Sequence, residues 1–107
     1  MIEIVINNQI YRLGRNAIEN FKLIDDSHPE DWWFHIDGFP SGHCVVSSLE
    51  NLIINKEIKK TAGALVKSYS KYKDLKKVKI VFTQIKYIVK TKNIGEVIIK
   101  NESSFFI

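Results

Sequence analysis

Short apolar runs separated by polar turns fill most of this chain, a pattern typical of β-strands. Two such runs, at residues 3–6 and 10–13, flank the pair Asn7-Asn8. Asparagine tolerates positive φ, so these residues predict a β-hairpin. Further strands are expected at residues 32–37, 43 to about 48, 78–82, 87–89, 96–99 and 104–107.

Two segments instead repeat apolar residues at helical spacing. A short helix should begin after Asn16, a typical N-cap residue with Glu19 three positions on, and should run to about Ile24. Its expected apolar face consists of Ala17, Phe21 and Ile24. A longer helix is expected at residues 55–72, with an apolar stripe of Ile58, Ala62, Leu65, Val66 and Tyr69. The pattern therefore predicts one α+β domain over residues 1–107, with a mostly antiparallel sheet.

The run at residues 32–37 has the most informative alternation in the chain. Successive side chains of a strand point to opposite faces, so Trp32, Phe34 and Ile36 should face the core. Trp33, His35 and Asp37 should then face the other way.

The five-residue loop 38–42 should pair this strand with the next one. We expect Asp37 to lie opposite His43, and His35 opposite Val45. That register gathers Trp33, His35, Asp37 and His43 on one open face, with Cys44 and Val46 in the core. An aromatic ring can stack on a base and imidazoles can bond to phosphates or base edges, so this face could bind nucleic acid. Alternatively, these residues only pack and hydrogen-bond within the fold.

Charge is divided unevenly along the chain. Residues 1–55 carry three basic against eight acidic residues, a balance of −5, and residues 56–107 carry thirteen lysines against four acids, a balance of +9. A basic half favours a polyanionic partner, because neutralised phosphates release counterions. The same lysines would also serve as an ordinary solvated surface.

The cysteine content and the lengths of the apolar runs limit the cellular compartment that we expect for the protein. Cys44 is the only cysteine, so no internal disulfide can form, and the sequence has no apolar run of membrane-spanning length and no signal peptide. We therefore expect a cytoplasmic protein without a membrane partner.

His35, His43 and Asp37 could hold zinc, but no metal-binding motif supports this. Cys44 and His43 are adjacent in a strand and point apart, which disfavours a thiol nucleophile. The sequence predicts no cofactor and no enzymatic activity.

Several motifs resemble the NFACT-R domain family. They are Gly14-Arg15-Asn16-Ala17 with Asn20 downstream, Asp31-x-Trp33-Phe34-His35, Pro40-Ser41-Gly42-His43, Ala62-Gly63-Ala64 and Tyr69-Ser70-Lys71-Tyr72-Lys73. The resemblance extends through residues 78–82, 89–90 and 95–97 and so covers nearly the whole chain. The sequence departs from the family pattern in its Pro-Ser-Gly-His order, in Cys44 where valine is usual, and in a short segment at 91–95.

The resemblance implies a non-catalytic module that binds structured RNA, either tRNA or rRNA, in translation or ribosome-associated quality control. Large members carry further domains, and a small coiled-coil relative implies DNA binding as an alternative. A further alternative is a protein-interaction domain that binds an acidic or ribosomal partner. The expected nucleic-acid-binding residues are Arg15, Asn16, Asn20, Trp33, His35, Ser41, His43, Lys67, Ser70 and Lys71.

Within this set, Arg15 could form a bidentate contact to phosphate. Lys67 and Lys71, four residues apart on one helix, would follow the nucleic-acid backbone. Gly14 and Asn20 also have a purely structural interpretation, as a positive-φ turn and a buried hydrogen-bonding amide.

Overall fold

The computed structural model of the chain describes residues 1–47 and 54–107. Six strands form one sheet in the order β1-β2-β4-β3-β5-β8. Their bounds are β1 Ile2–Ile6, β2 Gln9–Leu13, β3 Trp32–Ile36, β4 Cys44–Val46, β5 Lys79–Gln84 and β8 Ser103–Phe106. A separate hairpin joins β6 (Ile88–Lys90) and β7 (Val97–Ile99). Every strand pair among the described residues is antiparallel. The predicted strand end at Ser48 lies outside the described residues.

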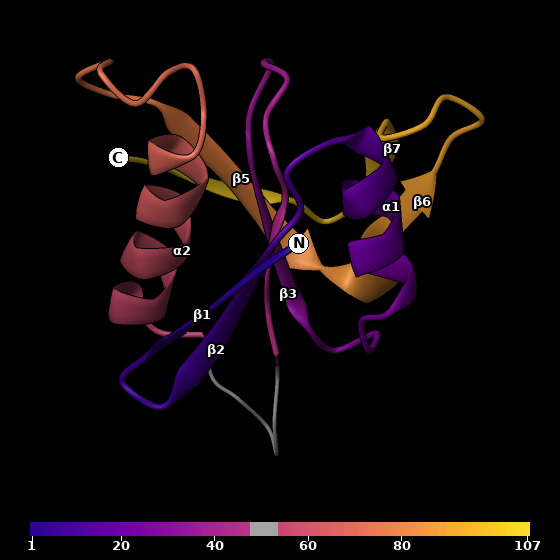
Figure 1. Cartoon of the computed structure of the whole chain (residues 1–107), viewed down its shortest axis with the longest axis horizontal. Coiled ribbons are helices and arrows are strands. Elements are labelled where there is room, and N and C mark those ends of the chain that lie inside the picture. The colour runs from indigo at the N-terminus through magenta and orange to yellow at the C-terminus, as the bar shows by residue number, and fades with distance from the viewer. Residues whose placement is uncertain (48–53) are drawn as a thin grey trace.

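The two helices lie on opposite faces of the main sheet (Figure 1). Helix α2 (Lys56–Ser68) packs on one face, where Phe34, Ile36, Ile58, Ala62 and Val66 belong to one buried cluster. Helix α1 (Ala17–Asp25) and the β6–β7 hairpin cover the other face, where Trp33 and Leu23 belong to a second cluster. The central strands β3, β4 and β5 are therefore largely buried on both faces, whereas the edge strands β1 and β8 are partly exposed. The α+β class predicted from the sequence is confirmed.

Local sequence rules explain both the first hairpin and the start of α1. Asn7 and Asn8 adopt φ values of 49° and 63°, which two-residue hairpin turns require. The Asn16 side chain caps α1 by accepting a hydrogen bond from the Glu19 backbone N–H at 2.9 Å. Both predictions are confirmed. Ala17, however, is exposed, and the buried residues of α1 are Asn20, Leu23 and Ile24.

Helix α2 ends earlier than the apolar stripe predicted. Ser70 interrupts it, because its hydroxyl donates to the Lys67 carbonyl at 2.7 Å and accepts from the Tyr72 N–H at 3.0 Å. Tyr69 consequently leaves the helix stripe, and its side chain is 56% exposed. In the described part of the chain, neither helix is long and apolar enough to cross a membrane.

The register of β3 and β4 differs by two residues from the prediction. Trp33 pairs with Val45 and Phe34 pairs with Cys44, whereas His35 was expected opposite Val45. A shift of two residues leaves each side chain on its predicted face. Phe34, Ile36, Cys44 and Val46 accordingly belong to the α2-side cluster, and Trp33 lies on the opposite side of the sheet.

Candidate nucleic-acid interface

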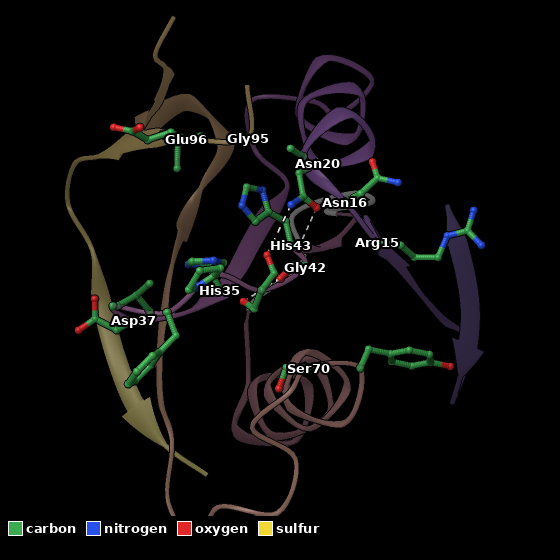
Figure 2. Close-up of a pocket in the computed structure, with 18 of the residues that line it drawn as sticks. Arg15, Asn16, Asn20, His35, Asp37, Gly42, His43, Ser70, Gly95 and Glu96 are labelled. Carbon is green, nitrogen blue, oxygen red and sulfur yellow. Dashed lines mark hydrogen bonds between the residues drawn. The ribbon is translucent and has the colours of Figure 1, made fainter. Parts of the chain in front are cut away.

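A cleft of about 720 Å³ opens at the end of the molecule where four segments meet. These segments are the start of α1, the loop between β3 and β4, the turn after α2, and the turn between β6 and β7 (Figures 1 and 2). The cleft is lined by most of the residues predicted to bind nucleic acid, namely Arg15, Asn16, Asn20, His35, Ser41, His43, Ser70 and Lys71. These predicted residues, which lie up to 56 positions apart in sequence, are thus gathered at one site.

A buried amide holds two of these segments together. The Asn20 side chain is 5% exposed, and its Oδ1 accepts a hydrogen bond from the His43 N–H at 3.0 Å. Beside it, the Gly14 N–H donates to the His43 carbonyl at 2.9 Å. The structural interpretation of Asn20 as a buried hydrogen-bonding amide is therefore confirmed.

Gly14 is required for a different reason from the one expected. A positive φ was considered for Gly14 from the sequence. Among the described residues, however, the glycines with positive φ are Gly38 and Gly95. A Cβ atom at Gly14 would instead lie 2.2 Å from the Asn20 Oδ1, far inside contact distance. Glycine at this position lets α1 approach the β3–β4 loop closely enough for the Asn20–His43 hydrogen bond.

The floor of the cleft is formed by two imidazole rings that pack against a buried indole ring. The imidazoles of His35 and His43 meet edge to face, with centroids 5.0 Å apart, and Trp33 packs against both at 5.5 and 5.0 Å. Trp33 is 0% exposed, because α1 and β6–β7 cover this face of the sheet. The expectation that Trp33 offers an open ring for stacking is therefore wrong, and the ring supports the imidazoles from beneath.

Burial sets the charge of this floor. Desolvation lowers the pKa of His35 to about 4, opposed by the nearby Asp37 carboxylate and a hydrogen bond with the Ser41 backbone. Desolvation and the neighbouring His35 lower the pKa of His43 to about 3. Both imidazoles are consequently neutral near neutral pH. They can donate or accept hydrogen bonds but cannot supply positive charge to a phosphate.

The cleft is lined by two positively charged residues, Arg15 and Lys71, and by two acidic residues, Asp37 and Glu96. Glu19 holds the Arg15 guanidinium at 2.9 and 3.0 Å, and this hydrogen bond and ion pair raise the pKa of Arg15. The Arg15 side chain is nevertheless 58% exposed, and a guanidinium has five N–H donors, so it retains donors for a ligand.

Lys67 does not belong to the cleft. Its ammonium donates to the Ile107 carbonyl at 3.3 Å, and Lys71 lies in the turn beyond the end of α2. The expectation that the two lysines follow one helix is therefore wrong, for the same reason that α2 ends early.

The structure also adds residues that the sequence did not single out. Phe39 and Tyr69 line the cleft with side chains 48% and 56% exposed. Gly95 and Glu96 reach it from the β6–β7 turn, where Gly95 (φ 86°) packs so closely on Ala17 that a Cβ atom would come within 2.7 Å of the Ala17 Cβ. The exposed aromatic in the Phe39-Pro40 loop was the available sequence signal for the first of these.

A lysine-rich surface continues from the cleft along α2 and the turn that follows it. It consists of Lys56, Lys59, Lys60, Lys67, Lys71, Lys73, Lys76 and Lys77. None of these forms an ion pair with the described residues. By contrast, Lys79, Lys86 and Lys90 are paired with Asp37, Glu30 and Asp25. Lys92 and Lys100 also form no ion pair with the described residues, but most of the unpaired lysines of the basic half lie on α2 and in the turn after it.

Within the described ranges, no group of three or more His, Cys, Asp or Glu side chains could hold a metal ion. Cys44 is fully buried on the side of the sheet away from His43, and burial raises the pKa of its thiol. This environment disfavours the reactive thiolate form.

Comparisons with known proteins agree with this geometry. A solved structure, the C-terminal of the fibronectin/fibrinogen-binding protein from Streptococcus suis, is 22% identical, with a TM-score of 0.88. The match covers 98% of this chain and 44% of that one, so the chain spans less than half the length of that structure. No curated protein sequence matches the chain. The profile of the NFACT protein RNA binding domain matches residues 5–105, and the chain therefore belongs to the NFACT RNA-binding domain family.

Proposed function

We propose that this chain is a binding module for structured RNA, either tRNA or rRNA, and that it acts in translation or ribosome quality control. The observation that carries the proposal is the cleft into which Arg15, Asn16, Ser70 and Lys71 converge from two distant segments. Membership of an RNA-binding domain family supports RNA as the partner.

The lysine-rich surface supplies the attraction that such a partner needs. Each phosphate that a lysine or arginine neutralises releases condensed counterions, which makes binding favourable and dependent on salt. The lysines of α2 and its following turn form no ion pair with the described residues, so binding a phosphate would not break an ion pair seen there. The cleft adds hydrogen-bonding side chains that a simple positive patch lacks, and these favour a partner of defined shape.

Fluorescence anisotropy with labelled tRNA tests the proposal. Arg15→Ala and Lys71→Ala should each weaken binding and reduce the slope of log affinity against log salt by about one. Lys86→Ala is the matched control, because Lys86 is ion-paired with Glu30 at 3.0 Å and lies outside the cleft. Circular dichroism confirms that each variant is folded.

The proposal fails if both cleft variants bind tRNA like the unaltered chain. Single-stranded RNA and duplex DNA serve as competitors at two salt concentrations. Equal competition by both, with binding that collapses as salt rises, would indicate a general polyanion surface or DNA as the partner. A pull-down that survives nuclease treatment, without direct RNA binding, would indicate an acidic or ribosomal protein partner.

A further inference from the structure

The floor of the cleft contains a buried polar atom, the Nδ1 of His43, that has no hydrogen-bond partner among the described residues. His43 is 2% exposed, lines the cleft, and makes no side-chain hydrogen bond to the described residues. Leaving a buried polar group unpaired is energetically unfavourable. An unpaired buried polar group in a native fold calls for an explanation, and a role at a functional site is one such explanation.

The same floor is unsuited to a phosphate. His35 and His43 are held neutral by burial, so neither contributes positive charge. A neutral imidazole presents one N–H donor and one nitrogen acceptor, the same kind of groups as the edge of a nucleobase. The depth of the cleft therefore favours a neutral ligand with hydrogen-bonding edges.

Two exposed aromatic rings line the same cleft. Phe39 comes from the β3–β4 loop and Tyr69 from the C-cap of α2, and both line the cleft. Phe39 packs against Tyr72 with ring centroids 4.7 Å apart, which braces its ring against the turn after α2. Exposed aromatic rings beside a cleft are the usual platform on which unpaired bases stack.

Charge also divides the cleft by function. Arg15 and Lys71 can bind a phosphate at the rim, whereas the carboxylates of Glu96 and of Asp37, which also pairs with Lys79, can accept hydrogen bonds from the amino groups of a base. Figure 2 shows Arg15 set apart from Asp37 and Glu96, with His35 and His43 between them. The volume of about 720 Å³ lies in the range of small-molecule pockets and can admit a nucleotide.

From this arrangement we infer that the cleft binds one unpaired nucleobase of the RNA. The base lies over His35 and His43, stacks against Phe39 or Tyr69, and has its flanking phosphates at Arg15 and Lys71. This inference rests on the proposed function and sharpens it, because it requires an extruded or single-stranded base within the structured RNA. A fully paired helix would occupy the lysine-rich surface alone.

Two matched RNA hairpins test the inference directly. One carries a single bulged guanosine, and the other has the same stem with an abasic residue at the bulge, so that ribose and phosphates are kept and only the base is lost. The unaltered chain should bind the bulged guanosine about tenfold more tightly, as expected for one stacked and hydrogen-bonded base. The double variant Phe39→Ala/Tyr69→Ala should bind both hairpins with equal affinity.

Phe106→Ala is the matched control, since Phe106 is an aromatic residue that is 64% exposed and lies outside the cleft. It should keep the tenfold preference. Equal affinity of the unaltered chain for the two hairpins would overturn the inference while leaving RNA binding intact. A preference that survives in the double variant would overturn the assigned stacking residues. Failure to bind either hairpin or tRNA would refute the proposed function itself.

Discussion

Mild acidification should destabilise this fold through the two imidazoles at the floor of the cleft. The folded-state pKa of His35 is lowered to about 4 and that of His43 to about 3, chiefly by burial. An unfolded chain binds these protons with a pKa near the ordinary value of about 6.5. The unfolded state therefore takes up more protons as the pH falls below that value, and stability falls with it.

The loss of stability depends on how far the pH falls below the unfolded-state pKa of the histidines while it stays above their folded-state pKa values. Between about pH 7 and about pH 5, each imidazole should cost about 2 kcal/mol, and the pair about 4 kcal/mol. This is a large share of the roughly 5–15 kcal/mol by which domains are stable. Glu19 and Glu30 have lowered pKa values, mainly through Arg15 and Lys86 respectively, so their contribution is lost only below their unfolded values of about 4.5. The window above about pH 5 thus isolates the histidines.

Urea unfolding at a series of pH values measures this directly. The unaltered chain should lose stability steadily from about pH 7 to about pH 5, and His35→Gln should lose about half as much. His28→Gln is the control, because His28 is exposed and outside the cleft, and it should keep the full dependence. Stability that stays constant over this window, or a His35→Gln slope equal to that of the unaltered chain, would refute the argument that burial holds the imidazoles neutral.

Two further predictions concern the packing behind the cleft. Gly14→Ala should reduce the free energy of unfolding by about 2–4 kcal/mol in urea titrations, because its Cβ atom displaces Asn20 and breaks the Asn20–His43 hydrogen bond. Gly38→Ala is the comparison, because a Cβ atom at Gly38 meets open space and only the φ of 77° makes the substitution unfavourable. It should cost about 1–2 kcal/mol of unfolding free energy. An equal loss in both variants would contradict the clash at Gly14. Cys44 should not react with a thiol reagent in the native state, because it is 0% exposed and burial raises the pKa of its thiol. It should react rapidly in denaturant. Labelling in the native state would instead show that this part of the core opens.

Local patterns in the sequence were sufficient for most of the fold. The Asn7-Asn8 turn and the Asn16 cap depend on residues close in sequence, and both were predicted correctly. The end of α2 was missed because one hydroxyl, that of Ser70, competes with the helix for backbone groups. Periodicity does not detect such a competition, and Tyr69 was consequently placed on the buried stripe instead of at the rim of the cleft.

The site was predicted in part, for a related reason. Strand alternation placed His35 and His43 on one face correctly even though the register was wrong by two residues. It could not show that α1 and the β6–β7 hairpin cover that same face, which is why Trp33 is buried and not open. The arrival of Glu96 at the cleft depends on the contact of Gly95 with Ala17, a pairing across 78 positions that no local pattern encodes.

The most direct test of RNA binding through the cleft is chemical-shift mapping of the isotope-labelled chain on addition of tRNA. The largest changes should fall on the backbone amides of Arg15, Ser41, His43, Ser70 and Lys71, with smaller changes along the lysines of α2. Changes confined to α2 would contradict a role for the cleft. Changes at the β1–β2 hairpin, or none at all, would contradict RNA binding both by the cleft and by the lysine-rich surface.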